Sequence, residues 1–344
     1  MKDLCEISRY AGMREDLVQA GGGNSAFKIA PEKMAIKASG YQLADITETD
    51  GFALVNPQIV REAFLKRDSL KEMTDEESKM ILERAYISGA RPSIETFLHS
   101  IAGRFSLHTH PVVVNAIACR KEGSNIFNQL FPNALIVPYA TPGVELAKAY
   151  FNAYKKYKEN NDEDPSIVFL MNHGLLVSAE TAEEVVTLME KVTNILEEYL
   201  NVDFKSYHYM KNLIKLYDDG ILWRVSDENV LNAYRKYKGT WNTSICPDCV
   251  VFLGKKMYSI ENNIDRNDFE HFVLNNGFPV ILEYMGNLYI HASSVRKALE
   301  IQSVLSFSAQ VTLLNSNIEV SLLTEDEKNF LLNWDAEKYR REIK

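Results

Sequence analysis

Three histidines are the residues of this chain best suited to hold a metal ion. Within residues 106–116, His108 and His110 are separated by one residue on an expected strand. Because side chains alternate between the two faces of a strand, both imidazoles project from the same side, roughly 6.5–7 Å apart at the backbone. A third imidazole, His173, follows a short apolar strand expected at residues 167–171. Three neutral imidazoles leave one position of a tetrahedral zinc site open, which is typical of a catalytic metal.

Polar residues near two glycine turns provide a second set of groups. Gly21, Gly22 and Gly23 precede Asn24, and the strand expected at residues 33–38 is followed by Ser39 and Gly40. Glycines let backbone N–H groups approach a ligand closely, so these two turns could form a nest for an anion.

An acidic residue near a helix start is the third element. Pro92 and Ser93 fit the start of a helix expected at residues 93–103, and Glu95 falls in its first turn, where the helix dipole favours a negative charge. His99 lies one turn beyond Glu95 and is either a fourth metal ligand or, as we favour, a packed histidine bonded to the backbone.

The composition limits the classes of partner. The chain has 344 residues, 46% of them hydrophobic, which is enough for a main domain of roughly 200 residues and a smaller one. A formal net charge of -9 argues against nucleic acid and anionic membranes as partners. The first residues lack the apolar run of a signal peptide, and no segment approaches the ~18 apolar residues of a membrane span. We therefore expect a cytoplasmic protein. The charge does not exclude a small anionic substrate, because a few local donors can hold a phosphate.

The cysteines carry little information about function. Four cysteines in a chain of 344 residues form no disulfide framework. Cys246 and Cys249 have the spacing of half a zinc knuckle or of a redox pair, but no second half is present. We interpret them as a turn that enters a strand at residues 250–253.

Hydrophobic periodicity predicts the architecture. Up to residue 202, helices alternate with strands, which predicts an α/β domain with a mixed sheet covered by helices. The expected strands are 25–30, 33–38, 106–110, 134–138, 167–171 and 175–178, and the expected helices are 57–66, 75–88, 93–103, 112–121, 144–158 and 181–200. In residues 203–344, the same patterns predict a smaller α+β region. Its expected helices are 266–275, 294–312 and 325–344, and a hairpin is expected at 280–283 and 288–292.

Together these motifs resemble the class II aldolase/adducin family over about residues 10–200. Residues 22–25 and 37–40 look like its two phosphate loops, and residues 92–95 look like the helix start that carries its catalytic glutamate. The forms Gly-Gly-Gly-Asn and Pro-Ser-Ile-Glu-Thr are closest to the aldolase part of bifunctional rhamnulose-1-phosphate aldolase/alcohol dehydrogenase proteins, and the chain is also L-fuculose-phosphate aldolase-like. The run at residues 333–339 resembles the connecting region of the bifunctional proteins.

The resemblance implies a fold, an activity and an assembly. The fold is a three-layer αβα aldolase-like domain at residues 1–202, followed by the α+β region at 203–344. The activity is that of a metal-dependent lyase in carbohydrate metabolism, which cleaves or forms a C–C bond in a small phosphorylated ketose. Family members form homotetramers with sites at subunit interfaces.

The resemblance also assigns roles to residues. Zn²⁺, or another divalent metal, would be held by the three histidines, and Glu95 would move the proton. The substrate phosphate would be held by Asn24, Ser39, Gly40 and Ser93, with help from the N-terminus of the helix at Ser93.

Two departures from the family pattern concern the substrate. Several phosphate-aldolase relatives have a second serine where Ile94 stands, so one phosphate donor is missing here. The aldolases also use a tyrosine from the adjoining subunit as a proton donor, and Tyr139 is only a candidate for it.

Two alternative functions remain. The same metal site serves epimerisation, dehydration and decarboxylation in this family. The other alternative is a non-catalytic, adducin-like binding protein, against which the retained Glu95 and three histidines argue.

Overall fold

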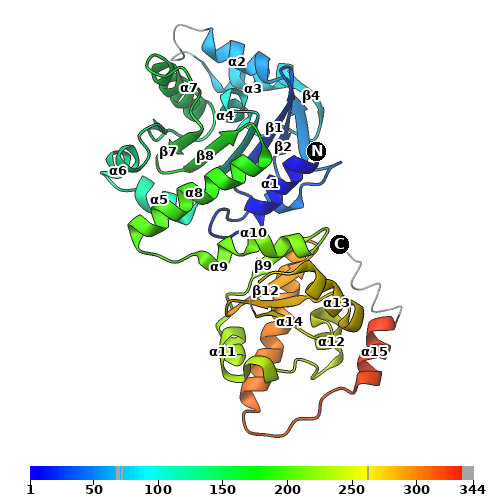
Figure 1. The fold of residues 1–344 in the computed structure, drawn as a ribbon. Helices are drawn as coiled ribbons and strands as arrows, with labels where there is room; N and C mark the ends of the chain where they lie inside the picture. The colour runs from blue at the N-terminus through cyan, green and yellow to red at the C-terminus, as the bar shows by residue number, and fades with distance from the viewer. Residues whose placement is uncertain (67–69, 71–72, 262, 335–344) are drawn as a thin grey trace. The chain divides into compact units, whose positions relative to one another are not determined.

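The computed structural model describes residues 1–66, 70, 73–261 and 263–334, and it divides the chain into two compact units, Met1–Phe204 and Lys205–Lys344 (Figure 1). The domain boundary expected from the sequence falls after residue 202. Each unit has its own sheet and is described separately below.

A mixed sheet forms the centre of the first unit. Among its described residues, eight strands lie in the order β4-β3-β2-β1-β5-β8-β7-β6. Only β6 and β7 are parallel to each other, and every other neighbouring pair in this sheet is antiparallel. The strands are β1 Asn24–Ala30, β2 Lys33–Lys37, β3 Phe52–Val55, β4 Tyr86–Gly89, β5 Phe105–Thr109, β6 Leu135–Val137, β7 Ile167–Leu170 and β8 Gly174–Ala179.

Helices cover both faces of this sheet (Figure 1). One layer consists of α1 Lys2–Gly12, α5 Val112–Ala118, α6 Gly123–Leu130 and α8 Ala182–Leu200. The other consists of α2 Pro57–Leu65, α3 Asp75–Ala85, α4 Thr96–Ile101 and α7 Val144–Lys158. The predicted three-layer αβα fold is confirmed.

The apolar strands at the middle of the sheet explain the two cores. In β8, Leu175 and Val177 pack into the core under α1 and α8, whereas Leu176 packs into the core under α4 and α7. Since side chains alternate along a strand, a strand covered on both faces must be apolar throughout. The long helix α8 is fixed at its start by a capping box, in which the Thr181 hydroxyl and the Glu184 carboxylate each accept a backbone N–H of the other residue.

The second unit contains a smaller sheet. Its described strands lie in the order β10-β11-β12-β9, with β10 parallel to β11 and the other pairs antiparallel. The strands are β9 Ile221–Arg224, β10 Tyr258–Ile260, β11 Ile281–Tyr284 and β12 Asn287–Ala292. The helices are α9 Lys205–His208, α10 Met210–Leu213, α11 Glu228–Tyr237, α12 Pro247–Leu253, α13 Arg266–Asn276, α14 Val295–Leu314 and α15 Glu325–Asn333. This arrangement confirms the predicted smaller α+β region.

Two local predictions are wrong. Residues 250–253 belong to the helix α12 and not to a strand, because Cys246 is an extended N-cap and Pro247 occupies the first helical turn. Residues 86–88 form the strand β4 instead of continuing α3, since Tyr86 and Ile87 favour a strand and Gly89 has a φ of +91°. The run at 333–339 and the last helix lie outside the described residues from residue 335 onward.

Within the described part of the chain, no helix has both the length and the apolar character that a membrane span requires.

Candidate metal centre

The strand β5 places the first two histidines at the centre of the sheet. His108 lies within β5, is fully buried, and faces Asn24 of β1 on one side and Leu176 of β8 on the other. His110 follows the end of the strand by one residue, and its N–H donates to the Leu17 carbonyl at 2.8 Å. Both side chains therefore come from backbone that neighbouring segments hold in place.

The turn between β7 and β8 brings the third histidine to the same place. Asn172 adopts the left-handed conformation, with a φ of +54°, and His173 follows it directly. Gly174 makes the close approach of this turn to β5 sterically allowed. A Cβ on residue 174 would lie 2.3 Å from the Thr109 carbonyl oxygen and 2.9 Å from the His110 ring.

The three imidazoles converge. The Nε2 atom of His108 lies 3.2 Å from Nε2 of His110 and 3.3 Å from Nε2 of His173. One ligand atom from each ring lies within 4.8 Å of the other two. The Nδ1 atom of His108 is 3.0 Å from the Leu175 carbonyl and donates to it, which leaves the Nε2 lone pair directed at the other rings.

The protonation state of these rings suits a cation. Burial, and then the neighbouring imidazoles, hold the pKa of His108 well below its usual range. Burial lowers the pKa of His110 to about 4, and it also lowers the pKa of His173. The rings are therefore neutral near pH 7, which is the form that binds a metal. A convergent set of three neutral imidazoles fits a divalent ion such as zinc.

Glu95 lies beside this cluster. Its Oε1 atom is 3.5 Å from Nε2 of His108. The expected position in the first helical turn is shifted, because Glu95 is the N-cap of α4 and the helix begins at Thr96. The preceding turn is closed by the Thr96 hydroxyl, which donates to the Ser93 carbonyl at 2.6 Å.

Two polar neighbours act on the Glu95 carboxyl. Burial raises its pKa, whereas the positive charge of Lys37 and a hydrogen bond from Asn24 lower it. Lys37 is only 4% exposed, and burial lowers the pKa of its own amine. The sequence reasoning placed Lys37 in a phosphate loop and missed it as a charge partner of Glu95. The signal for it was a lysine in the otherwise apolar run at residues 34–38.

The family of this chain is shown by a sequence match that spans most of the first unit. Residues 2–200 match the family described as Class II Aldolase and Adducin N-terminal domain. The chain belongs to this family. The resemblance noted in the sequence is thereby confirmed.

Known proteins are similar to part of this class II aldolase family member. The uncharacterized oxidoreductase YuxG of Bacillus subtilis (strain 168) is 30% identical over an alignment of 216 residues, which covers 58% of this chain and 30% of that protein. The chain thus spans less than a third of that relative's length.

Two solved structures are also similar. The N-terminal class II aldolase domain of a conserved protein from Thermoplasma acidophilum has 26% identity and a TM-score of 0.49, covering 58% of this chain and 92% of that chain. An L-fuculose 1-phosphate aldolase has 18% identity and a TM-score of 0.40, covering 62% and 95%.

In this chain, the residues expected to bind the substrate phosphate fall into two groups. Ser39 and Ser93 line one cavity of about 740 Å³. Asn24 lies instead beside Glu95, and its buried Oδ1 atom has no hydrogen-bond partner among the described residues. Gly40, with a φ of +89°, follows Ser39 but is not among the described residues that line this cavity.

Other candidate residues lie outside the metal centre. His99 packs in the interior, as favoured from the sequence, but its Nδ1 atom lies 2.6 Å from the Ser106 hydroxyl and so bonds to a side chain instead of the backbone. Tyr139 is 61% exposed on the first unit. The sulfur atoms of Cys246 and Cys249 lie 3.4 Å apart, but no third ligand joins them within the described residues.

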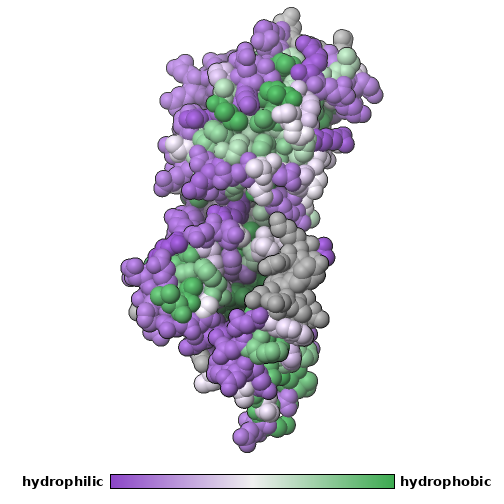
Figure 2. All heavy atoms as spheres, turned by 90° about the vertical axis from the view of Figure 1, so that its right-hand side faces the viewer, coloured by the Kyte–Doolittle hydropathy of each residue, from purple (hydrophilic) through white to green (hydrophobic). Residues whose placement is uncertain are grey.

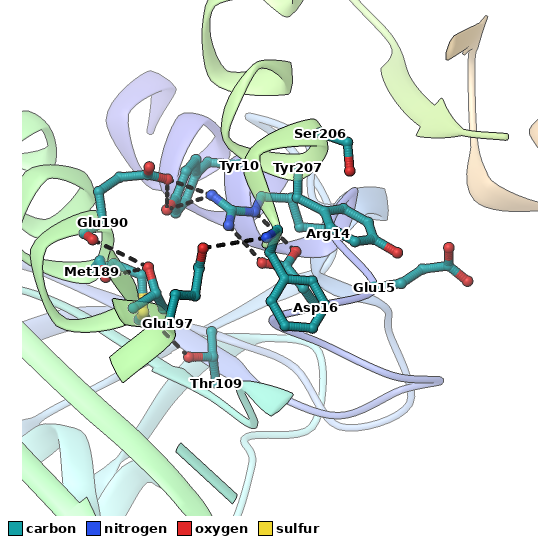
Figure 3. A network of polar contacts seen from close by, with 12 residues as sticks. Tyr10, Arg14, Glu15, Asp16, Thr109, Met189, Glu190, Glu197, Ser206 and Tyr207 are labelled. Carbon is teal, nitrogen blue, oxygen red and sulfur yellow. Dashed lines mark hydrogen bonds and ion pairs between the residues drawn. The ribbon is translucent and has the colours of Figure 1, made fainter. Parts of the chain in front are cut away.

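A buried ion-pair network supports the segment that leads out of β5 (Figure 3). The fully buried Arg14 contacts Asp16 through two nitrogens, at 2.6 and 3.0 Å, and also pairs with Glu190 of α8. The Asp16 carbonyl in turn accepts the N–H of Val112, at 2.9 Å. The turn around Arg14 therefore fixes the backbone at His110 and at Val112.

Proposed function

We propose that this protein is a metal-dependent class II aldolase, a lyase that cleaves or forms a C–C bond in a small phosphorylated ketose. The observation that carries the proposal is the convergence of three imidazole nitrogens beside the Glu95 carboxylate. Three neutral imidazoles form the donor set of a catalytic site in which one position stays open for substrate, and the carboxylate beside them can move a proton.

The metal ligands are His108, His110 and His173. They would hold a divalent ion, with zinc preferred, which would supply a Lewis acid for the substrate carbonyl. The chain prepares this site in advance, because Gly174 lets the rings approach and the Leu175 carbonyl orients the His108 ring.

Glu95 is the proton-transfer residue of the proposal. Its carboxylate lies at the edge of the imidazole cluster, where a carbon-bound proton of the substrate would be within reach. The burial that raises its pKa makes it a stronger base than an exposed carboxylate. The charge of Lys37 and the hydrogen bond from Asn24 lower this pKa and so favour the ionised form of the carboxyl.

The substrate phosphate is assigned to Asn24, Ser39, Gly40 and Ser93. The cavity lined by Ser39 and Ser93 supports the assignment of these two residues, since its volume is that of a small-molecule site. The hydroxyl of Ser93 already accepts the N–H of Glu95 at 3.2 Å, which leaves its own proton available for an anion.

We also propose a homotetramer, in which a tyrosine of an adjoining subunit serves as proton donor. The outer strand β4 carries Tyr86 and Ile87, which are 42% and 48% exposed. Figure 2 shows apolar residues gathered among polar ones on this side of the first unit. An exposed apolar edge strand favours coverage by another chain.

The test of the function is an assay with zinc-loaded protein and a panel of ketose 1-phosphates. Release of an aldehyde together with dihydroxyacetone phosphate supports the aldolase. An isomeric sugar phosphate without aldehyde identifies an epimerase that uses the same site. Absence of both products and of stoichiometric metal would leave a binding protein of the adducin type.

A further inference from the structure

The cavity that Ser39 and Ser93 line also has charged side chains on its wall. Its lining also includes the side chains of Lys79 of α3 and Arg91, which precedes the α4 region. Two cations on the wall of one small-molecule cavity create a positive potential that attracts an anion. The sequence reasoning assigned neither residue.

The backbone holds Arg91 next to Ser39. The Ser39 N–H donates to the Arg91 carbonyl at 3.0 Å, and Ala38 forms a β-bridge with Pro92. These contacts join the end of β2 to the segment that carries Ser93. As a result, a guanidinium and two hydroxyls line the same hollow.

Both cations are available for a ligand. Lys79 and Arg91 are exposed, and neither forms an ion pair with another described residue. Glu83 is the acidic side chain on the described lining, so the wall carries two positive charges and one negative charge. The net positive charge of the wall still favours an anion. The Glu83 carboxylate can accept hydrogen bonds from the hydroxyl groups of a ligand.

Ile94 leaves this cavity with one hydrogen-bond donor fewer for a phosphate. It lines the same cavity, at the position where a second serine donor was missing from the sequence, and its side chain cannot hydrogen-bond. A hydroxyl gives one neutral hydrogen bond, whereas Arg and Lys form charge-assisted bonds to phosphate that are roughly twice as strong. Lys79 and Arg91 together would therefore bind a phosphate more strongly than the missing serine hydroxyl would.

The cavity is also adjacent to the reacting end of the site. A second, smaller hollow is lined by Glu95 and His173, and Ile94 lines both hollows. A substrate could therefore place its carbonyl end at the histidines and its anionic end in the larger cavity.

We propose that Lys79 and Arg91 bind the phosphate group of the substrate, together with the hydroxyls of Ser39 and Ser93. This inference rests on the proposed function, which supplies the phosphorylated substrate. It adds the residues that provide the positive charge, and it makes binding at this site dependent on ionic strength.

The experiment measures binding of inorganic phosphate to the zinc-loaded protein by calorimetry. Arg91→Ala and Lys79→Ala should each weaken phosphate binding by roughly tenfold, because each removes a charge-assisted contact. Arg84→Ala is the matched control, since Arg84 is exposed on the same helix as Lys79 but does not line the cavity. Glu83→Gln should strengthen binding by removing the opposing charge.

A second variant separates this site from the metal. His108→Ala removes a proposed ligand of the ion and should leave phosphate binding unchanged. Loss of phosphate binding in His108→Ala would place the anion on the metal and overturn the proposal. Equal affinities in Arg91→Ala, Lys79→Ala and Arg84→Ala would also overturn it, as would a wild-type protein that binds no phosphate. The aldehyde-release assay reports separately on the proposed function, so a failure there leaves the phosphate measurements interpretable.

Discussion

The Nε2 atoms of His108 and His173 lie 3.3 Å apart although 65 positions separate the two residues along the chain. The approach is made by the pairing of β8 with β5, which aligns Leu175 with Thr109 and sets the turn that carries His173 against the end of β5. The metal centre is therefore a product of the sheet topology. A change that disturbs this pairing should disturb metal binding before it unfolds the unit.

Glu95→Gln should retain the metal and lose turnover. The amide has nearly the size of the carboxylate but cannot accept the proton, and general acid–base catalysis is worth about 10²–10⁴-fold in rate. The measurement is kcat of the zinc-loaded variant, with metal content determined on the same sample. Glu163→Gln, at an exposed carboxylate, is the control and should keep full activity. Full activity in Glu95→Gln would remove Glu95 from the mechanism.

Much of the site could be predicted because its residues have local signatures. The two histidines of β5 share a face through the two-residue period of a strand, and His173 follows an apolar run that had to be an internal strand. The helices at 144–158 and 181–200 were also predicted closely, since they have long amphipathic patterns, and the second has a capping box.

The remaining features depend on contacts between distant segments. The four-residue strands β3 and β9 are too short to show a period, and α12 contains valines that favour strands while its start is set by Cys246 and Pro247. The effect of Lys37 on Glu95 arises only when β2 lies beside the α4 region. No spacing in the sequence indicates that Arg91 and Lys79 meet at one cavity.

Gly174→Ala should weaken metal binding strongly. The added Cβ would lie 2.3 Å from the Thr109 carbonyl oxygen, so β8 must move away from β5 and carry His173 with it. Overpacking of this kind costs about 1–3 kcal/mol in the free energy of unfolding. Zinc affinity is measured by competition with a chromophoric chelator. Gly21→Ala is the matched control, because a Cβ there meets nothing within 4 Å. Equal zinc affinities in the two variants would show that the β7–β8 turn does not position the ligand.

Arg14→Met should destabilise the first unit by about 3–5 kcal/mol, since it leaves the buried carboxylates of Asp16 and Glu190 without their cation. Urea unfolding followed by circular dichroism measures this loss. Arg84→Met, at an exposed arginine, should change stability by less than about 0.5 kcal/mol. Zinc affinity should fall as well in Arg14→Met, because the backbone around His110 loses its support. A wild-type unfolding curve would mean that the network contributes no net stability.

The buried His99 should make the metal-free protein less stable in mild acid. Burial, and then the charge of Lys28, lower the pKa of His99 from 6.5 to about 3. Between these two values the unfolded state binds a proton that the folded state excludes, so stability falls as the pH decreases through 6.5 toward 3. From pH 7 to pH 5 this residue alone accounts for a loss of about 2 kcal/mol.

The measurement for His99 is urea unfolding at several pH values. His99→Gln should show a shallower loss than the wild type, whereas His271→Gln, at an exposed histidine, should keep the wild-type slope. Parallel slopes for all three proteins would show that His99 does not titrate differently in the two states.

The most direct test of the metal centre is anomalous diffraction at the zinc absorption edge from crystals of the zinc-loaded protein. The proposal predicts one strong peak per chain, about 2.0–2.1 Å from the Nε2 atoms of His108, His110 and His173. It also predicts that the peak, and the zinc found by elemental analysis, disappear in His108→Ala but persist in His271→Ala. A peak at Cys246 and Cys249, or no peak in the wild-type protein, would contradict the proposal that these three imidazoles hold a metal ion.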